Sequence, residues 1–148
     1  MKQTIPYWHE LPDLDLYLDQ VLLYVNQATN SAEQMEQKSL TAAMINNYVK
    51  HKQLEKPVKK KYQKQQVARL IALTILKNVF SIQEISQTLH LLLQTNSSET
   101  LYNHFVDCMR NEENEKTPDI IRYACQSVKL YYKTRQLTVE LERKYHES

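Results

Sequence analysis

Apolar residues recur three and four positions apart along most of the chain, which is the spacing that places them on one face of a helix. The pattern predicts helices over residues 14–28, 39–51, 63–80, 81–93 and 118–145, with a further helix between the polar residues 96–99 and the charged break at 111–116. The polar stretch 29–38 is predicted to be a loop. The chain is therefore expected to be all-α.

The segment 39–51 separates into two faces. An inward stripe is formed by Leu40, Met44, Ile45, Tyr48 and Val49, and the opposite face by Ala43, Asn46, Asn47 and Lys50. Ser39 or Thr41 can cap the first backbone donors. The outward face is small at its start, rich in amides and cationic at its end, so it can enter a groove and hydrogen-bond to base edges or phosphates. Any amphipathic helix with a modest polar face shows the same pattern, and both interpretations stay open.

Residues 57–62 interrupt the helical pattern. Pro57 disfavours helix at the residue before it, so the preceding helix should end near His51 or Lys52. The segment has extended character and predicts a short two-stranded wing, with Val58 and Tyr62 as anchors and three lysines pointing outward. These lysines are Lys59, Lys60 and Lys61.

Two signals mark helix starts in the second half of the chain. Ser81 and Glu84 have the spacing of a capping box. Thr117 followed by Pro118 opens a helix without internal breakers to Tyr145, about 42 Å long. We expect residues 1–95 to form one domain and 96–148 a C-terminal helical region. The last helix is predicted to make homodimer contacts through 118–145, or alternatively to pack back across its own domain.

The composition of the chain limits which functions are possible. Glycine is absent from the 148 residues, which excludes glycine-cradled phosphate loops and tight Asn-Gly hairpins. The net charge is only +2, yet residues 50–69 carry eight lysines and arginines against one acid. Such concentrated positive charge is typical of proteins that bind polyanions, although a solvated basic face explains it too.

Other features point away from membranes and catalysis. The start of the chain lacks a secretory signal, no stretch reaches the roughly 18 apolar residues of a membrane span, and we expect a cytoplasmic protein. Cys108 and Cys125 are expected to be buried thiols. His104 and Cys108 lie four residues apart, but two ligands do not make a metal site. No nucleophile–base arrangement is recognisable. We therefore predict no enzyme activity, cofactor or metal.

The order of a short helix, a basic wing, a long apolar helix and a capped helix resembles the winged helix-turn-helix of MerR-type regulators over residues 40–93. The matching motifs are Asn46-Asn47-Tyr48, Leu54, Lys60, Tyr62, the run from Val67 to Leu70, and the run from Phe80 to Ile85. With the Leu-Pro-Asp opening at Leu11 and the Ile-Asn-Asn-Tyr helix, the chain resembles more narrowly the uncharacterised bacterial domain-of-unknown-function family 1836, which has no assigned activity.

The chain departs from the MerR pattern at three places. Asn46 stands where the recognition helix of that family has arginine, Lys52 stands where it has glycine, and the glycine that turns the wing is missing. The lost arginine removes one phosphate contact. The missing glycines predict a different geometry for the turn and the wing.

The resemblance and the charge pattern together imply a transcriptional regulator that binds double-stranded DNA, with helix 41–51 in the major groove and the wing lysines on phosphates. The expected contact residues are Thr41, Ala43, Asn46, Asn47, Tyr48, Lys50, His51, Lys59, Lys60, Lys61 and Tyr62. The alternative is a non-enzymatic adaptor that keeps the scaffold and meets an acidic protein surface without reading a DNA sequence.

Overall fold

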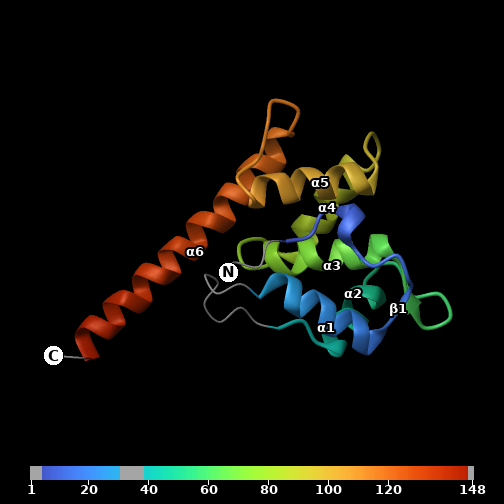
Figure 1. Ribbon diagram of the computed structural model, residues 1–148, viewed down its shortest axis with the longest axis horizontal. Coiled ribbons are helices and arrows are strands. Elements are labelled where there is room, and N and C mark those ends of the chain that lie inside the picture. Colours follow the sequence, from blue (N-terminus) through green and yellow to red (C-terminus); the bar gives the residue numbers. More distant parts are fainter. Residues whose placement is uncertain (1–4, 31–38, 147–148) are drawn as a thin grey trace.

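The protein is mainly helical. The structure is a computed structural model, and it describes residues 5–30 and 39–146. The elements are η1 (Trp8–Glu10), β1 (Leu16–Tyr17), α1 (Leu18–Thr29), α2 (Ala42–Lys50), β2 (Lys61–Tyr62), α3 (Lys64–Leu76), α4 (Ile82–Leu92), α5 (Ser98–Met109) and α6 (Asp119–His146). Figure 1 shows α1 to α5 gathered into one body, from which the second half of α6 extends as an arm.

Helix α3 forms the centre of the core. Leu70, Ile71, Leu73 and Ile75 are completely buried, because α3 is covered by α1 on one side and by α4, α5 and α6 on others. The same hydrophobic cluster continues past residue 95, through Phe105 and Val106 of α5 to Val128 of α6. The C-terminal helices therefore share the interior of the first 95 residues.

The predicted first residue of the first helix is wrong. It was expected to begin at residue 14, but α1 begins at Leu18, and Leu14 is 79% exposed. The reason is a tertiary pairing. Leu16 and Tyr17 are extended and pair antiparallel with Tyr62 and Lys61, which lie 46 and 44 residues later in the chain. The predicted loop 29–38 falls largely on residues 31–38, outside the described part of the chain.

The predicted capping signals are confirmed. The Thr41 hydroxyl accepts a hydrogen bond from the Met44 amide at the start of α2. At the start of α4, Ser81 and Glu84 exchange side-chain and backbone hydrogen bonds of 3.1 and 3.2 Å. The last helix begins and ends within one residue of the predicted bounds. These ends are set by local sequence, which is why the pattern located them.

Candidate nucleic-acid interface

Helix α2 is held against α1 by its apolar stripe and by one asparagine. Ile45 and Tyr48 are buried. The Asn26 side chain of α1 donates to the carbonyl of Leu40 at 3.0 Å and accepts from the amide of the same residue at 2.8 Å. Because this pair of hydrogen bonds fixes the backbone just before Thr41, α2 begins at a defined position on the body.

The outward face of α2 is available to a partner. Ala43, Asn46, Asn47 and Lys50 are all exposed, as is Thr41 at the N-cap. Within the described part of the chain, neither Asn46 nor Asn47 uses its side-chain amide in a hydrogen bond. An amide carries two donors and an acceptor with two lone pairs. The face therefore presents uncommitted hydrogen-bonding groups on a rigid element.

The lysine run forms a tight turn. The amide and carbonyl of Val58 bond reciprocally to those of Lys61, both at 3.0 Å, so only two residues close the turn. Both of them, Lys59 and Lys60, have left-handed backbone, with φ of 51° and 67°. The predicted wing thus turns without the glycine that the MerR pattern has there, because two lysines take the left-handed conformation. Lys52, two residues after the end of α2, stands where the MerR pattern has glycine. It also adopts a left-handed backbone conformation, with φ of 59°.

Two of the predicted contact residues serve the core instead. The side chains of Tyr48 and Tyr62 are only 5% and 3% exposed, and burial raises the pKa of both hydroxyls. Both tyrosines were predicted to contact DNA, and their burial leaves little side-chain surface for such a contact. Their physical role is to anchor the outward-facing residues beside them, since Tyr48 fastens α2 and Tyr62 fastens β2 to the interior.

The remaining predicted contact residues differ in exposure and in the contacts that their side chains make. Lys59 and Lys60 are exposed, whereas Lys61 is half-buried with its ammonium 5.2 Å from the centre of the Tyr17 ring. His51 is exposed at the C-cap of α2, and its Nδ1 lies 3.1 Å from the carbonyl oxygen of Asn47. Backbone near the helix end thus orients the His51 ring.

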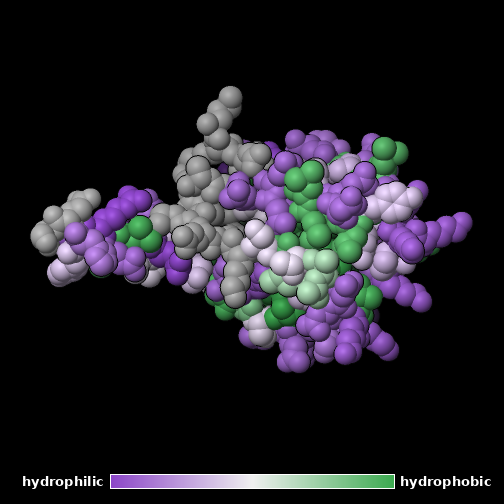
Figure 2. Space-filling view, turned by 90° about the horizontal axis from the view of Figure 1, so that it is seen from below, coloured by the Kyte–Doolittle hydropathy of each residue, from purple (hydrophilic) through white to green (hydrophobic). Residues whose placement is uncertain are grey.

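Among the described residues, most cations of the segment 50–69 have no acidic partner within ion-pair distance. Lys64 pairs with Asp13 at 2.8 Å and lowers the pKa of that carboxyl, and the half-buried Arg69 donates to the carbonyl of Gln53. The other six cations of the segment lie on α2, β2 and the loop between them. They are Lys50, Lys52, Lys56, Lys59, Lys60 and Lys61. Figure 2 shows hydrophilic side chains extending from the end of the body where Figure 1 places this loop.

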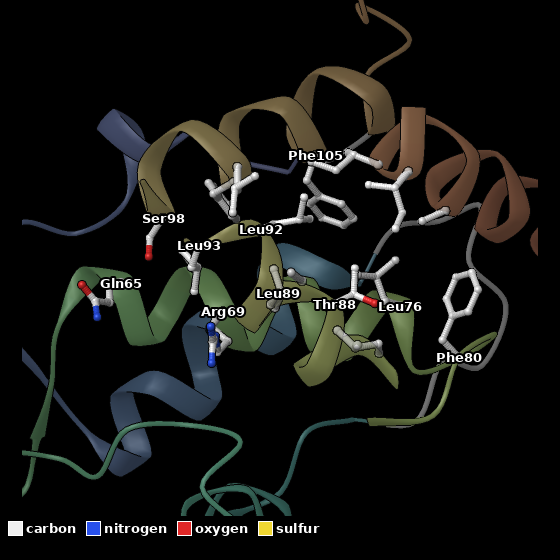
Figure 3. A pocket seen from close by; sticks show the side chains of 18 of the residues that line it. Gln65, Arg69, Leu76, Phe80, Thr88, Leu89, Leu92, Leu93, Ser98 and Phe105 are labelled. Atoms are coloured by element: carbon white, nitrogen blue, oxygen red, sulfur yellow. The ribbon is translucent and has the colours of Figure 1, made fainter. Parts of the chain in front are cut away.

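A second surface feature was missed by sequence reasoning. An apolar groove of about 670 Å³ lies between α3, α4, α5 and α6 (Figure 3). Its walls include the apolar residues Phe80, Leu89 and Leu92. All three are half-buried, with part of the side chain facing the groove. Periodicity identifies an apolar face but cannot tell whether another element covers it.

The described residues contain no cluster of three or more histidine, cysteine, aspartate or glutamate side chains suited to a metal ion. None of the helices in the same part of the chain is both long and apolar enough to span a membrane.

A family model matches residues 6–105, from the N-terminal segment into α5, and so includes α2, the lysine turn and the core helix α3. The chain belongs to the family described as Domain of unknown function (DUF1836). No curated protein and no solved structure matches the chain. The function of this DUF1836 domain must therefore be argued from its own surface.

The lysine turn gives a testable effect on stability. Left-handed backbone costs a lysine about 1 kcal/mol, whereas asparagine and glycine tolerate it. Relief at two positions gives about 2 kcal/mol, of which the extra entropy that glycine loses on folding offsets roughly half. The double variant Lys59→Asn/Lys60→Gly should therefore have a free energy of unfolding about 1 kcal/mol higher, measured by urea denaturation. The exposed Lys56, which lies outside the turn, provides the control Lys56→Asn, expected to change stability by less than about 0.5 kcal/mol. A loss of stability in the double variant would contradict the turn geometry.

Proposed function

We propose that this DUF1836 domain is a transcriptional regulator that binds double-stranded DNA with a MerR-like winged helix-turn-helix. Helix α2 enters the major groove, and the turn at Lys59 and Lys60 lies on flanking phosphates. The observation that carries the proposal is the pair of exposed, uncommitted amides at Asn46 and Asn47, on a helix that is followed, after residues 51–57, by a lysine-rich turn.

The chemistry of these groups fits the two parts of a duplex. The major groove is wide enough for an α-helix, and an asparagine amide can bond bidentately to the N6 and N7 of adenine. Lysines are point charges that release condensed counterions when they neutralise phosphates. The amides of α2 would thus supply base readout, and Lys50 with the turn lysines would supply sequence-independent affinity and orientation.

The contacts that hold α2 and β2 in place also favour a role for these two elements in DNA binding. Both α2 and β2 contact α1, so one helix holds the two proposed contact elements. Asn26 fixes the start of α2, and the pairing of β2 with β1 fixes the residue that follows the turn. Contact groups on braced elements lose little conformational entropy on binding, which is what a preorganised site requires.

Placing negative charge on the exposed face of α2 tests the proposal. The double variant Asn46→Asp/Asn47→Asp keeps side-chain shape but places two carboxylates against the DNA, and we expect at least a tenfold loss of affinity, about 1.4 kcal/mol. Fluorescence anisotropy on a random-sequence duplex measures it. The matched control is Gln83→Glu/Gln87→Glu on the exposed side of α4. Equal affinities of the two double variants would contradict a DNA contact by α2.

We further propose that the DNA-binding unit is a homodimer formed through α6. The second half of this helix leaves the body and is exposed along almost its whole length. A dimer would place two copies of α2 on paired half-sites and gain affinity through avidity.

A further inference from the structure

The apolar groove between α3, α4, α5 and α6 has the size of a small-molecule site. Its volume of about 670 Å³ lies within the roughly 300–1,000 Å³ that is typical of ligand pockets in proteins. Such pockets have mainly apolar walls and a few polar groups that orient the ligand. The residues that line this groove can therefore be read for the chemistry of a ligand.

Small side chains keep the middle of the groove open. Ala68 and Ala72 lie on the face of α3 that lines the groove, and Ala124 lies on the wall that α6 forms. An alanine projects only a methyl group, so the neighbouring helices cannot fill the space between the larger side chains. The aliphatic side chains around this space are Leu76, Leu89, Leu92, Leu93 and Ile121. The middle of the groove therefore suits a flexible aliphatic chain.

Polar side chains gather toward one end of the groove. Gln65 and Arg69 lie one helical turn apart on α3, and Ser98 lies in the first turn of α5. Figure 3 shows these three side chains toward one end, and Leu76 and Phe80 toward the other. Seven residues separate Arg69 from Leu76, which is about 10 Å along the helix axis. The groove is thus elongated along α3, with a polar end and an apolar end.

Arg69 is the cation of the polar end, and most of its donors are uncommitted. Among the described residues, its guanidinium donates once, from Nη1 to the carbonyl of Gln53 at 3.2 Å, and no carboxylate lies within ion-pair distance. A guanidinium carries five N–H donors in a planar fork that matches a carboxylate. The side chain is half-buried, and partial exclusion of water strengthens its attraction for an anion. Arg69 can therefore bind a ligand carboxylate.

Two carboxylates of the lining limit the charge of the ligand. Glu84 accepts from the Ser81 amide at 3.2 Å, and Glu55 accepts from the Gln65 side chain at 3.4 Å. Both side chains are exposed, so solvent screens their repulsion of a single negative charge. A doubly charged group such as a phosphate monoester would be repelled more strongly and would meet only one cation. The lining therefore favours a monoanion.

We infer that the groove binds a fatty acid, a monocarboxylate with one long aliphatic tail. The carboxylate pairs with Arg69 at the polar end, beside the side chains of Gln65 and Ser98. The tail follows α3 over Ala72 toward Leu76 and displaces water from the aliphatic walls. Burial of the tail contributes most of the affinity, and the ion pair fixes the direction in which the ligand lies.

Titration calorimetry with ligands that share a tail and differ in head group tests the inference. The probes are decanoate, decanol and decyltrimethylammonium, added to the full chain without DNA and below micelle-forming concentrations. An extended ten-carbon tail spans about 11 Å, close to the separation of Arg69 and Leu76 along α3. We expect decanoate to bind about tenfold more tightly than either other ligand, because only the carboxylate accepts charge-assisted hydrogen bonds.

The head-group comparison needs no variant and can overturn the inference by itself. Equal affinities for the three ligands would show an apolar groove without a carboxylate subsite. Tightest binding of the cation would show that Glu55 and Glu84 dominate the electrostatics of the groove. Binding of none of the three would leave the groove to another occupant, such as an apolar protein segment. Each of these results would contradict a fatty-acid site.

Two substitutions locate the ligand in the groove. Arg69→Gln removes the charge, and we expect about tenfold weaker binding of decanoate with unchanged binding of decanol, which also shows that the variant is folded. The matched control Arg135→Gln, at an exposed position of α6, should bind both ligands as the native protein does. Thr88→Trp fills the groove from α4 and should weaken both ligands about tenfold or more. Full preference for decanoate in Arg69→Gln, or native affinities in Thr88→Trp, would overturn the inference.

Discussion

Replacing Lys59, Lys60 and Lys61 together by alanine is expected to lower the affinity for duplex DNA by about two orders of magnitude at 0.1 M salt. If about five phosphates are neutralised per protomer, the slope of log affinity against log salt should be near −4 to −5. Loss of three contacts should reduce its magnitude by about 2.7. Because phosphate contacts carry no sequence information, the loss should be similar for all duplex sequences. Anisotropy titrations between 50 and 200 mM salt measure both quantities.

The control for this prediction removes the same formal charge elsewhere. Lys116, Arg135 and Arg143 are exposed and lie outside the segment 50–69. Their joint replacement by alanine should change DNA affinity by less than about threefold, because charges beyond a Debye length of about 10 Å are screened. If the two triple variants lost affinity equally, net charge and not the turn would account for binding.

Truncating the centre of α3 is expected to have the largest effect on stability. The side chain of Leu73 is fully buried between helices from both halves of the chain. Leu73→Ala should lower the free energy of unfolding by about 3 kcal/mol, since it removes buried methyl groups and leaves a cavity. The matched control is Leu91→Ala on α4, where the side chain is 63% exposed. Urea denaturation with similar m-values should show a loss below about 1 kcal/mol for the control.

The whole protein is expected to unfold in a single cooperative transition during the same urea denaturation. The buried cluster joins Leu73 to Phe105 of α5 and Val128 of α6, so the two parts should unfold together. Two separate transitions, with only one of them shifted in Leu73→Ala, would contradict a shared interior.

Local signals were sufficient to predict most of the helices. The Ser81–Glu84 exchange satisfies backbone donors within three residues, so the sequence alone specifies where α4 begins. At α2 the sequence offered Ser39 or Thr41 as the cap, and the structure has Thr41. The outward face of α2 followed from periodicity in the same way, and Asn46 and Asn47 are exposed as that pattern requires. Interactions that close within one turn of helix are readable from a single sequence.

The features that sequence did not predict depend on distant parts of the chain. Leu16 lies within the predicted helix 14–28, but it is part of a strand because Tyr62 offers a pairing partner. Lys59 and Lys60 adopt left-handed backbone that lysine disfavours, and no local pattern indicates it. Leu89 is only half-buried because it lines the groove, although the spacing of Leu89 matches that of a core residue. In each case tertiary contacts override the local preference.

Affinity selection on random duplexes tests the DNA-binding proposal most directly. Successive rounds with the full chain should enrich a short consensus sequence, and selection with Asn47→Ala should change the preferred base at one position of each half-site, since the amide proposed to read that base is gone. Recovery of the input pool without enrichment would contradict sequence-specific binding by α2. The basic surface would then serve a different, acidic partner.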